Sequence, residues 1–116
     1  MGDTMKLIMK DQALDAITNG EFGNDIIGTS EKVAVILTQS WCPQWYAMKL
    51  FAADFSGAEI YFLEYDRTNF FDEFRRFKEQ VLGNDQIPYV RYYSDGVLIA
   101  ESNYVSAETF QQNIGK

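Results

Sequence analysis

Short, unbroken apolar runs alternate along this chain with segments whose apolar residues recur every three or four positions. Three of the apolar runs predict strands, at 5–9, 33–37 and 60–65. The segment after each run has helical spacing and predicts a helix, at 11–17, 43–55 and 68–83. The run at 33–37 has no polar residue, which is typical of a central strand covered on both faces.

Polar residues, proline and glycine suggest where these elements begin and end. Asp11 is expected to cap the first helix, and Thr68 or Asn69 the third, because short polar side chains accept hydrogen bonds from the first turn. Pro43 suits the first turn of the second helix, where its missing N–H would have no partner. The glycine-rich segment 20–30 is expected to be an irregular loop.

The last third of the chain contains a hairpin signal. Strand-like runs at 87–93 and 97–100 flank Asp95 and Gly96, and Asp-Gly between two such runs favours a tight hairpin turn. A short helix at 106–113 follows. The element order is therefore β-α-β-α-β-α-β-β-α, which predicts an α/β fold with a central mixed sheet and helices on both faces.

Aromatic residues make up 16% of the sequence and are expected to supply much of the core. Phe70, Phe74, Phe77 and Val81 recur at helical spacing, and this stripe is interpreted as core packing against the sheet. Tyr89, Tyr92 and Tyr93 alternate between the faces of one strand, so at least one of them is expected to reach solvent.

Length and charge limit the class of protein. A chain of 116 residues predicts one domain, 1–116. The net charge of −7 argues against nucleic acid and anionic membranes as partners. The sequence has no apolar window long enough for a membrane span and no apolar leader near its start, so a cytoplasmic location is expected.

The sequence contains one cysteine, Cys42, and no histidine. A single cysteine excludes an internal disulfide. The absence of histidine excludes a Cys–His couple, a Ser–His triad and a histidine-based metal site. We therefore predict no metal and no cofactor.

The motifs around Cys42 resemble those of the thioredoxin superfamily over most of the chain. The segment Trp41-Cys42-Pro43-Gln44-Trp45 follows the apolar central strand, where that family has Trp-Cys-x-x-Cys. Ile87-Pro88 begins a later strand, where the family has a cis-proline beside the active-site sulfur, and the hairpin and Asp66 also match family positions. The resemblance implies a thioredoxin fold, a cis Pro88, and a site formed by Cys42 as catalytic residue with Trp41, Pro43, Trp45, Ile87 and Pro88 binding the substrate.

Three departures from the family pattern affect the chemistry. Trp45 occupies the position of the resolving cysteine, Ile36 that of a buried aspartate, and Phe62 that of a lysine. Reduction of protein disulfides by a dithiol therefore requires a second thiol that this chain lacks.

Monothiol chemistry remains open to Cys42. The predicted helix N-terminus directs unpaired N–H groups at the sulfur, which favours the thiolate that attacks disulfides. Cys42 would then form a mixed disulfide with a thiol or disulfide of a protein or small molecule, and an external thiol would resolve it. Glutathione is one candidate, and Cys42-Pro43 is similar to the start of glutaredoxin sites. Gln39 and Glu101-Ser102 depart from the glutathione-binding residues of that family, which also disfavours shared iron–sulfur ligation.

A second hypothesis is a binding module that keeps the scaffold without the chemistry. Cys42 would be packed and idle, as most lone cysteines are. A peptide would add as a strand beside Ile87-Pro88 and Trp41. Trp45 then either fills the space beside the sulfur or donates its indole N–H to a partner. A monomer is expected, although a lone reactive thiol also allows a disulfide-linked dimer.

Overall fold

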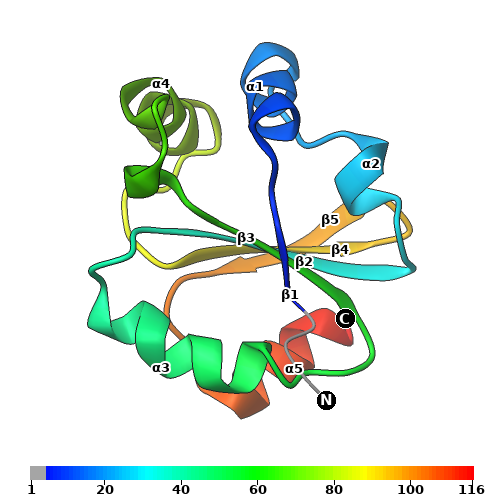
Figure 1. The fold of residues 1–116 in the computed structure, drawn as a ribbon. Coiled ribbons are helices and arrows are strands. Elements are labelled where there is room, and N and C mark those ends of the chain that lie inside the picture. The colour runs from blue at the N-terminus through cyan, green and yellow to red at the C-terminus, as the bar shows by residue number, and fades with distance from the viewer. Residues whose placement is uncertain (1–4) are drawn as a thin grey trace.

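The computed structural model describes residues 5–116, which form a five-stranded sheet between two layers of helices (Figure 1). The strands are β1 (Met5–Leu7), β2 (Lys32–Thr38), β3 (Glu59–Glu64), β4 (Tyr89–Ser94) and β5 (Val97–Ser102). Their order across the sheet is β1-β3-β2-β4-β5. β1, β3 and β2 are parallel, whereas β4 and β5 are antiparallel to their neighbours. The predicted mixed α/β sheet is confirmed.

The helices divide between the two faces of the sheet (Figure 1). They are α1 (Lys10–Asn19), α2 (Asn24–Ile27), α3 (Pro43–Ala52), α4 (Phe71–Arg76) and α5 (Ala107–Ile114). α1, α2 and α4 lie on one face, and α3 and α5 lie on the other. Within residues 5–116, none of these helices has the length and apolarity that a membrane span requires.

β2 runs through the middle of the molecule and supplies both apolar layers. Val33, Val35 and Leu37 are buried in the layer beneath α1 and α4, and Ala34 and Ile36 in the layer beneath α3 and α5. Burial of each of the larger side chains stabilises the fold by about 1.5–3 kcal/mol. This double burial explains the unbroken apolar run at 33–37.

Two of the predicted helix starts and one predicted loop are wrong. α1 begins at Lys10 rather than after Asp11, because the Gln12 side chain accepts a hydrogen bond from the Met9 N–H and closes the first turn. α4 has Phe70 as its N-cap, one position beyond Asn69. α2 lies inside the segment expected to be a loop, since burial of Ile26 and Ile27 stabilises a helix too short to show a periodic pattern.

The stripe of apolar residues at 70, 74, 77 and 81 is buried as predicted, except for Val81. Phe70, Phe74 and Phe77 belong to the core, whereas Val81 is 59% exposed. Residues Phe77–Val81 form a π-helical turn. The wider turn changes the angular spacing of side chains, so a residue at ordinary helical spacing no longer faces the core.

The expectation that one strand tyrosine reaches solvent is wrong. Tyr89, Tyr92 and Tyr93 are all buried, because helices cover both faces of β4. Each hydroxyl has a hydrogen-bond partner: Tyr92 pairs with Ser102 at 2.7 Å, and Tyr89 and Tyr93 donate to carboxylates. Burial raises the pKa of Tyr89 to about 12 and that of Tyr93 further.

The hairpin between β4 and β5 turns at Asp95 and Gly96. Both residues have positive φ angles, 51° and 77°. A two-residue turn of this kind matches the twist of the flanking strands, and glycine adopts the required conformation without strain. The hairpin prediction is confirmed.

Candidate functional site

Cys42 is the N-cap of α3, at the end of the loop that follows β2. Its extended backbone conformation (φ −77°, ψ 118°) ends the loop, and Pro43 occupies the first helical position. The Cys42 side chain is buried, with 4% of its surface exposed. Cys42 therefore lies directly before the first turn of a ten-residue helix, although its side chain makes no capping hydrogen bond with that turn.

The fold brings Cys42 next to the predicted Ile87-Pro88 segment, 45 residues away in sequence. The Sγ atom lies 4.0 Å from the Ile87 carbonyl oxygen, at the outer limit for a sulfur hydrogen bond. The Ile87–Pro88 peptide bond is cis, the isomer that the family resemblance implies. Cys42, Ile87 and Pro88 thus lie together at one end of the sheet.

Trp41 and the loop before Cys42 are held by side-chain hydrogen bonds. Trp41 is 63% exposed, and its Nε1 donates to Oε1 of Gln39 at 2.7 Å. Asp66 accepts from both the Ser40 N–H, at 2.8 Å, and the Ser40 hydroxyl, at 2.6 Å. This double contact fixes the loop that presents Trp41 and positions Cys42.

Trp45 fills the space beneath the first turn of α3 and is fully buried. Its indole Nε1 donates to Oε2 of Glu64 at 2.7 Å, and its ring packs against Phe62. The Lys49 ammonium lies 3.5 Å from the same Glu64 oxygen and 5.4 Å from the centre of the indole. Trp45 therefore packs as a plug, and its indole N–H is already used within the chain by Glu64.

Apolar packing replaces the buried acid–base pair that the family resemblance implies. Ile36 is buried in the same apolar cluster as Cys42, and Phe62 packs on the edge of this cluster. Neither side chain can accept or donate a proton. Ile36 and Phe62 therefore take no part in proton transfer at Cys42.

Lys78 anchors the loop that leads to Ile87. Its ammonium is buried and donates to the carbonyl oxygens of Asn84, at 2.8 Å, and Gln86, at 2.6 Å. Removal from solvent lowers the pKa of Lys78 to about 8. Sequence reasoning missed this residue, although Lys78 follows the buried Phe74 by four positions and so falls on the core face.

Asn103, directly after β5, holds the same loop. Its Nδ2 donates to the carbonyl oxygen of Pro88 and to the side chain of Asn84, both at 3.0 Å. The carbonyls on either side of Ile87 thus have fixed donors, which leaves the Ile87 carbonyl directed at Cys42. Across residues 5–116, the structure contains no group of three or more His, Cys, Asp or Glu side chains arranged to hold a metal ion.

Sequence comparison identifies no relatives of this chain. No family model matches it, and no curated protein matches it.

Structural comparison finds many similar folds. Thioredoxin O2 from Arabidopsis thaliana in its oxidized state superposes with a TM-score of 0.67 at 11% identity, covering 95% of this chain and 90% of that one. A mutant thioredoxin from Halobacterium salinarum gives 0.62 at 14% identity, with 97% and 88% covered. The long form of spinach chloroplast thioredoxin f gives 0.61 at 14% identity, with 97% and 84% covered. At these identities the likeness shows the fold, and the chain has the thioredoxin fold.

Proposed function

We propose that this thioredoxin-fold chain performs thiol–disulfide exchange through one thiol, Cys42, with an external thiol completing the cycle. The observation that carries the proposal is the placement of Cys42 as the N-cap of α3, with its sulfur facing the Ile87 carbonyl. Unpaired N–H groups at a helix N-terminus stabilise negative charge, and the thiolate is the form of cysteine that attacks disulfides.

The proposed reaction has two exchange steps. In the first, the Cys42 thiolate attacks one sulfur of a disulfide, forms a mixed disulfide and releases the other sulfur as a thiolate. In the second, an external thiolate attacks the bound partner's sulfur, forms a new disulfide with it and releases the Cys42 thiolate. Each step makes one S–S bond and breaks one, so no further oxidant or reductant is needed. Trp45 occupies the place from which a second thiol of this chain would act.

The partner is a disulfide or thiol of a protein or small molecule, with glutathione among the candidates. Trp41 would supply an exposed aromatic surface beside the sulfur. The Ile87 and Pro88 backbone would lie along the bound segment. Pro43, which is exposed next to Cys42, would line the substrate site, whereas the fully buried Trp45 would shape the first turn of α3 from within.

The test is formation of a mixed disulfide with oxidised glutathione, followed by intact-mass spectrometry. We expect one glutathione adduct per chain, its removal by added reduced glutathione, and no adduct on Cys42→Ser. Trp41→Ala is expected to slow adduct formation with a disulfide-containing peptide more than with oxidised glutathione. Absence of an adduct at saturating reagent would exclude the exchange reaction for this small disulfide and favour the alternative below.

The alternative is a non-catalytic peptide- or protein-binding module. It is favoured by the low exposure of Cys42, 4%, and by the full burial of Trp45 in the place of a second thiol. In this case Cys42 acts as a small apolar side chain. If the chain is a binding module, Cys42→Ser should still bind its partner. If the chain is a redox protein, the same substitution should abolish thiol–disulfide exchange.

A further inference from the structure

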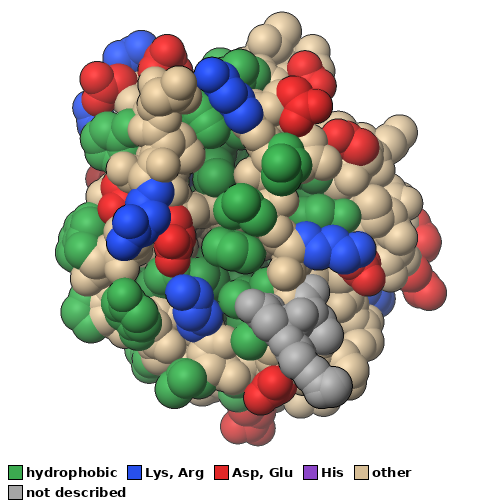
Figure 2. Space-filling view, in the orientation of Figure 1, with side chains coloured by type: hydrophobic (Ala, Val, Ile, Leu, Met, Phe, Trp, Pro, Cys, Tyr) green, Lys and Arg blue, Asp and Glu red, His purple; other side chains and the backbone are tan. Residues whose placement is uncertain are grey.

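A groove of about 530 Å³ lies beyond the end of β1, the edge strand of the sheet, and its lining does not include Cys42. It occupies the end of the sheet where the parallel strands β1 and β3 both finish. Its apolar surface comes from Leu7, Ile8, Met9, Phe62, Leu63 and Phe70. Figure 2 shows this face, with apolar side chains in a strip through the middle of the view and both basic and acidic side chains around it. Such a surface is large and apolar enough to receive side chains of a partner.

The backbone of β1 is ready to accept another strand. Leu7 is the register partner of Phe62, and the Ile8 N–H donates to the Phe62 carbonyl oxygen at 2.9 Å. In a parallel ladder with this pattern, the N–H and C=O of Leu7 itself point away from β3. Among residues 5–116 these two groups have no hydrogen-bond partner. They form an open sheet edge, which an extended peptide can satisfy.

The charges around the groove favour an anionic segment. Its charged lining residues are Lys10, Arg67 and Glu64. The Glu64 carboxylate is already occupied by Trp45 and Lys49, and it lies 3.8 Å from Arg67. Lys10 has no carboxylate partner among the described residues. The groove therefore carries unneutralised positive charge on a protein whose net charge is −7.

We propose that this groove binds an extended peptide segment of alternating apolar and acidic residues, paired as an added strand on β1. Side chains of a strand alternate between faces. Apolar residues of the peptide would lie beside Leu7 and Phe62, which share one face, and its carboxylates would lie toward Lys10 on the α1 side. Because the groove does not include Cys42, the proposed peptide binding needs no reaction of the thiol.

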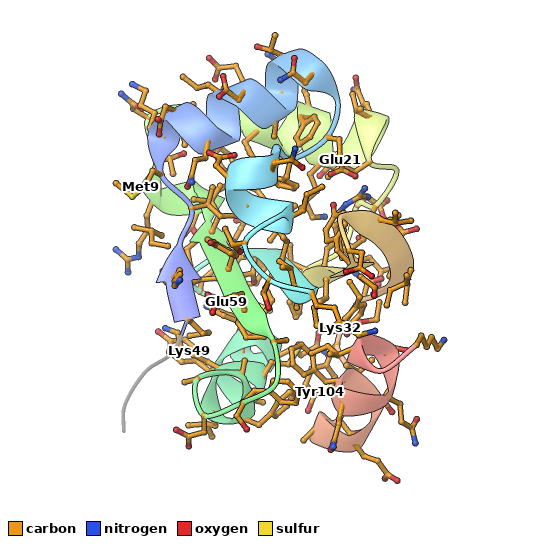
Figure 3. The ribbon with its side chains drawn as sticks, turned by 90° about the vertical axis from the view of Figure 1, so that its right-hand side faces the viewer. Met9, Glu21, Lys32, Lys49, Glu59 and Tyr104 are labelled. Carbon is orange, nitrogen blue, oxygen red and sulfur yellow. The ribbon has the colours of Figure 1, made fainter. Side chains whose placement is uncertain are left out.

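The test measures fluorescence anisotropy of a labelled hexapeptide that alternates valine and glutamate. We expect saturable binding that weakens as salt is added, because the proposed contacts include exposed charges. The double variant Lys10→Glu/Arg67→Glu is expected to weaken binding by about tenfold or more, through loss of attraction and gain of repulsion. Lys32→Glu is the matched control, and Figure 3 shows Lys32 across the molecule from Met9 and Lys49.

Leu7→Pro tests the strand pairing separately. Proline removes the outward N–H of Leu7 without removing a hydrogen bond to β3, so the sheet should remain intact by circular dichroism. Binding of the peptide is expected to fall by about tenfold, the effect of one lost backbone hydrogen bond and an altered edge.

Three results would overturn the proposal. The first is the absence of an anisotropy change at peptide concentrations up to about 1 mM, because a dissociation constant above this value means negligible affinity. The second is equal binding of a peptide with lysine in place of glutamate. The third is a dimer in sedimentation that Leu7→Pro converts to monomer, which would assign the edge to a second copy of the chain. Cys42→Ser, which cannot form the glutathione adduct, should bind the peptide as the wild type does. Failure of the thiol-exchange proposal and failure of the peptide-binding proposal can therefore be recognised separately.

Discussion

The indole nitrogen of Trp45 and the carboxylate of Glu64 are joined by a 2.7 Å hydrogen bond between the first turn of α3 and the end of β3. Trp45 stands at the position where the family resemblance places a second cysteine. Lys49 contacts the same carboxylate oxygen, so Glu64 has donors from two successive turns of α3. The helix start is thereby fixed to the sheet by a polar contact inside an otherwise apolar layer.

Trp45→Phe is expected to destabilise the protein by about 1–3 kcal/mol, because Glu64 loses a buried donor and the smaller ring leaves a gap. Urea denaturation followed by circular dichroism measures the loss. Trp41→Phe is the matched control and should change stability by about 0.5 kcal/mol or less, since Trp41 is mostly exposed. Equal losses in the two variants would show that the Trp45–Glu64 contact contributes nothing specific.

Asp66→Ala is expected to increase the rate at which iodoacetamide alkylates Cys42. The Ser40 N–H and hydroxyl both donate to Asp66, and without it the loop before Cys42 loses two fixed contacts. The sulfur, now 4% exposed, should become more accessible. The rate at fixed pH is compared with that of Asp15→Ala, which removes an exposed carboxylate on α1. An unchanged rate in Asp66→Ala would mean that the loop is held by its packing alone.

Much of this site follows from the sequence, because its residues have local signatures. Pro43 after Cys42 marks the helix start, and Asp95-Gly96 marks the hairpin. Contacts between distant segments have no such signature. Tyr93, for example, donates its hydroxyl to Glu21, 72 positions away in the sequence. The Trp45–Glu64 bond depends on a register between α3 and β3 that neither segment specifies alone.

Arg91 illustrates a buried charge that depends on such distant contacts. Its guanidinium donates to Glu21 at 2.6 Å and to the hydroxyls of Tyr93, at 2.7 Å, and Tyr89, at 2.9 Å. Arg91→Met should destabilise the protein by about 3 kcal/mol, because a carboxylate and two buried hydroxyls lose their donor. Glu21→Gln should cost less, since Glu21 is partly exposed and the amide still accepts a hydrogen bond. Thermal and urea unfolding compare the two, and a larger loss in Glu21→Gln would contradict this assignment.

The lowered pKa of Lys78 predicts that the stability of the protein depends on pH. Its pKa is lowered to about 8 in the folded protein, from an ordinary value of 10.5, because burial disfavours the ammonium. Between these two values the unfolded chain holds a proton that the folded protein has released. The free energy of unfolding should therefore rise with pH in this range, by at most about 1.4 kcal/mol per pH unit for one group. Below pH 8 the contribution is constant, since both states are protonated.

The measurement compares the wild type with Lys78→Met by urea unfolding at several pH values from 8 to 10. This range lies below the raised pKa of Tyr89, about 12, so that buried tyrosine does not ionise in the folded protein. The stability of the wild type relative to Lys78→Met should increase across the range, whatever constant cost the variant has from leaving the Asn84 and Gln86 carbonyls without a donor. The attraction between the Lys78 ammonium and the carboxylates of Glu79 and Asp85 opposes the lowering of the Lys78 pKa without reversing it. Lys116→Met changes an exposed lysine, so its free energy of unfolding should follow the same pH dependence as that of the wild type. Parallel curves for Lys78→Met as well would mean that water reaches its ammonium, and that the loop before Ile87 is held without a desolvated charge.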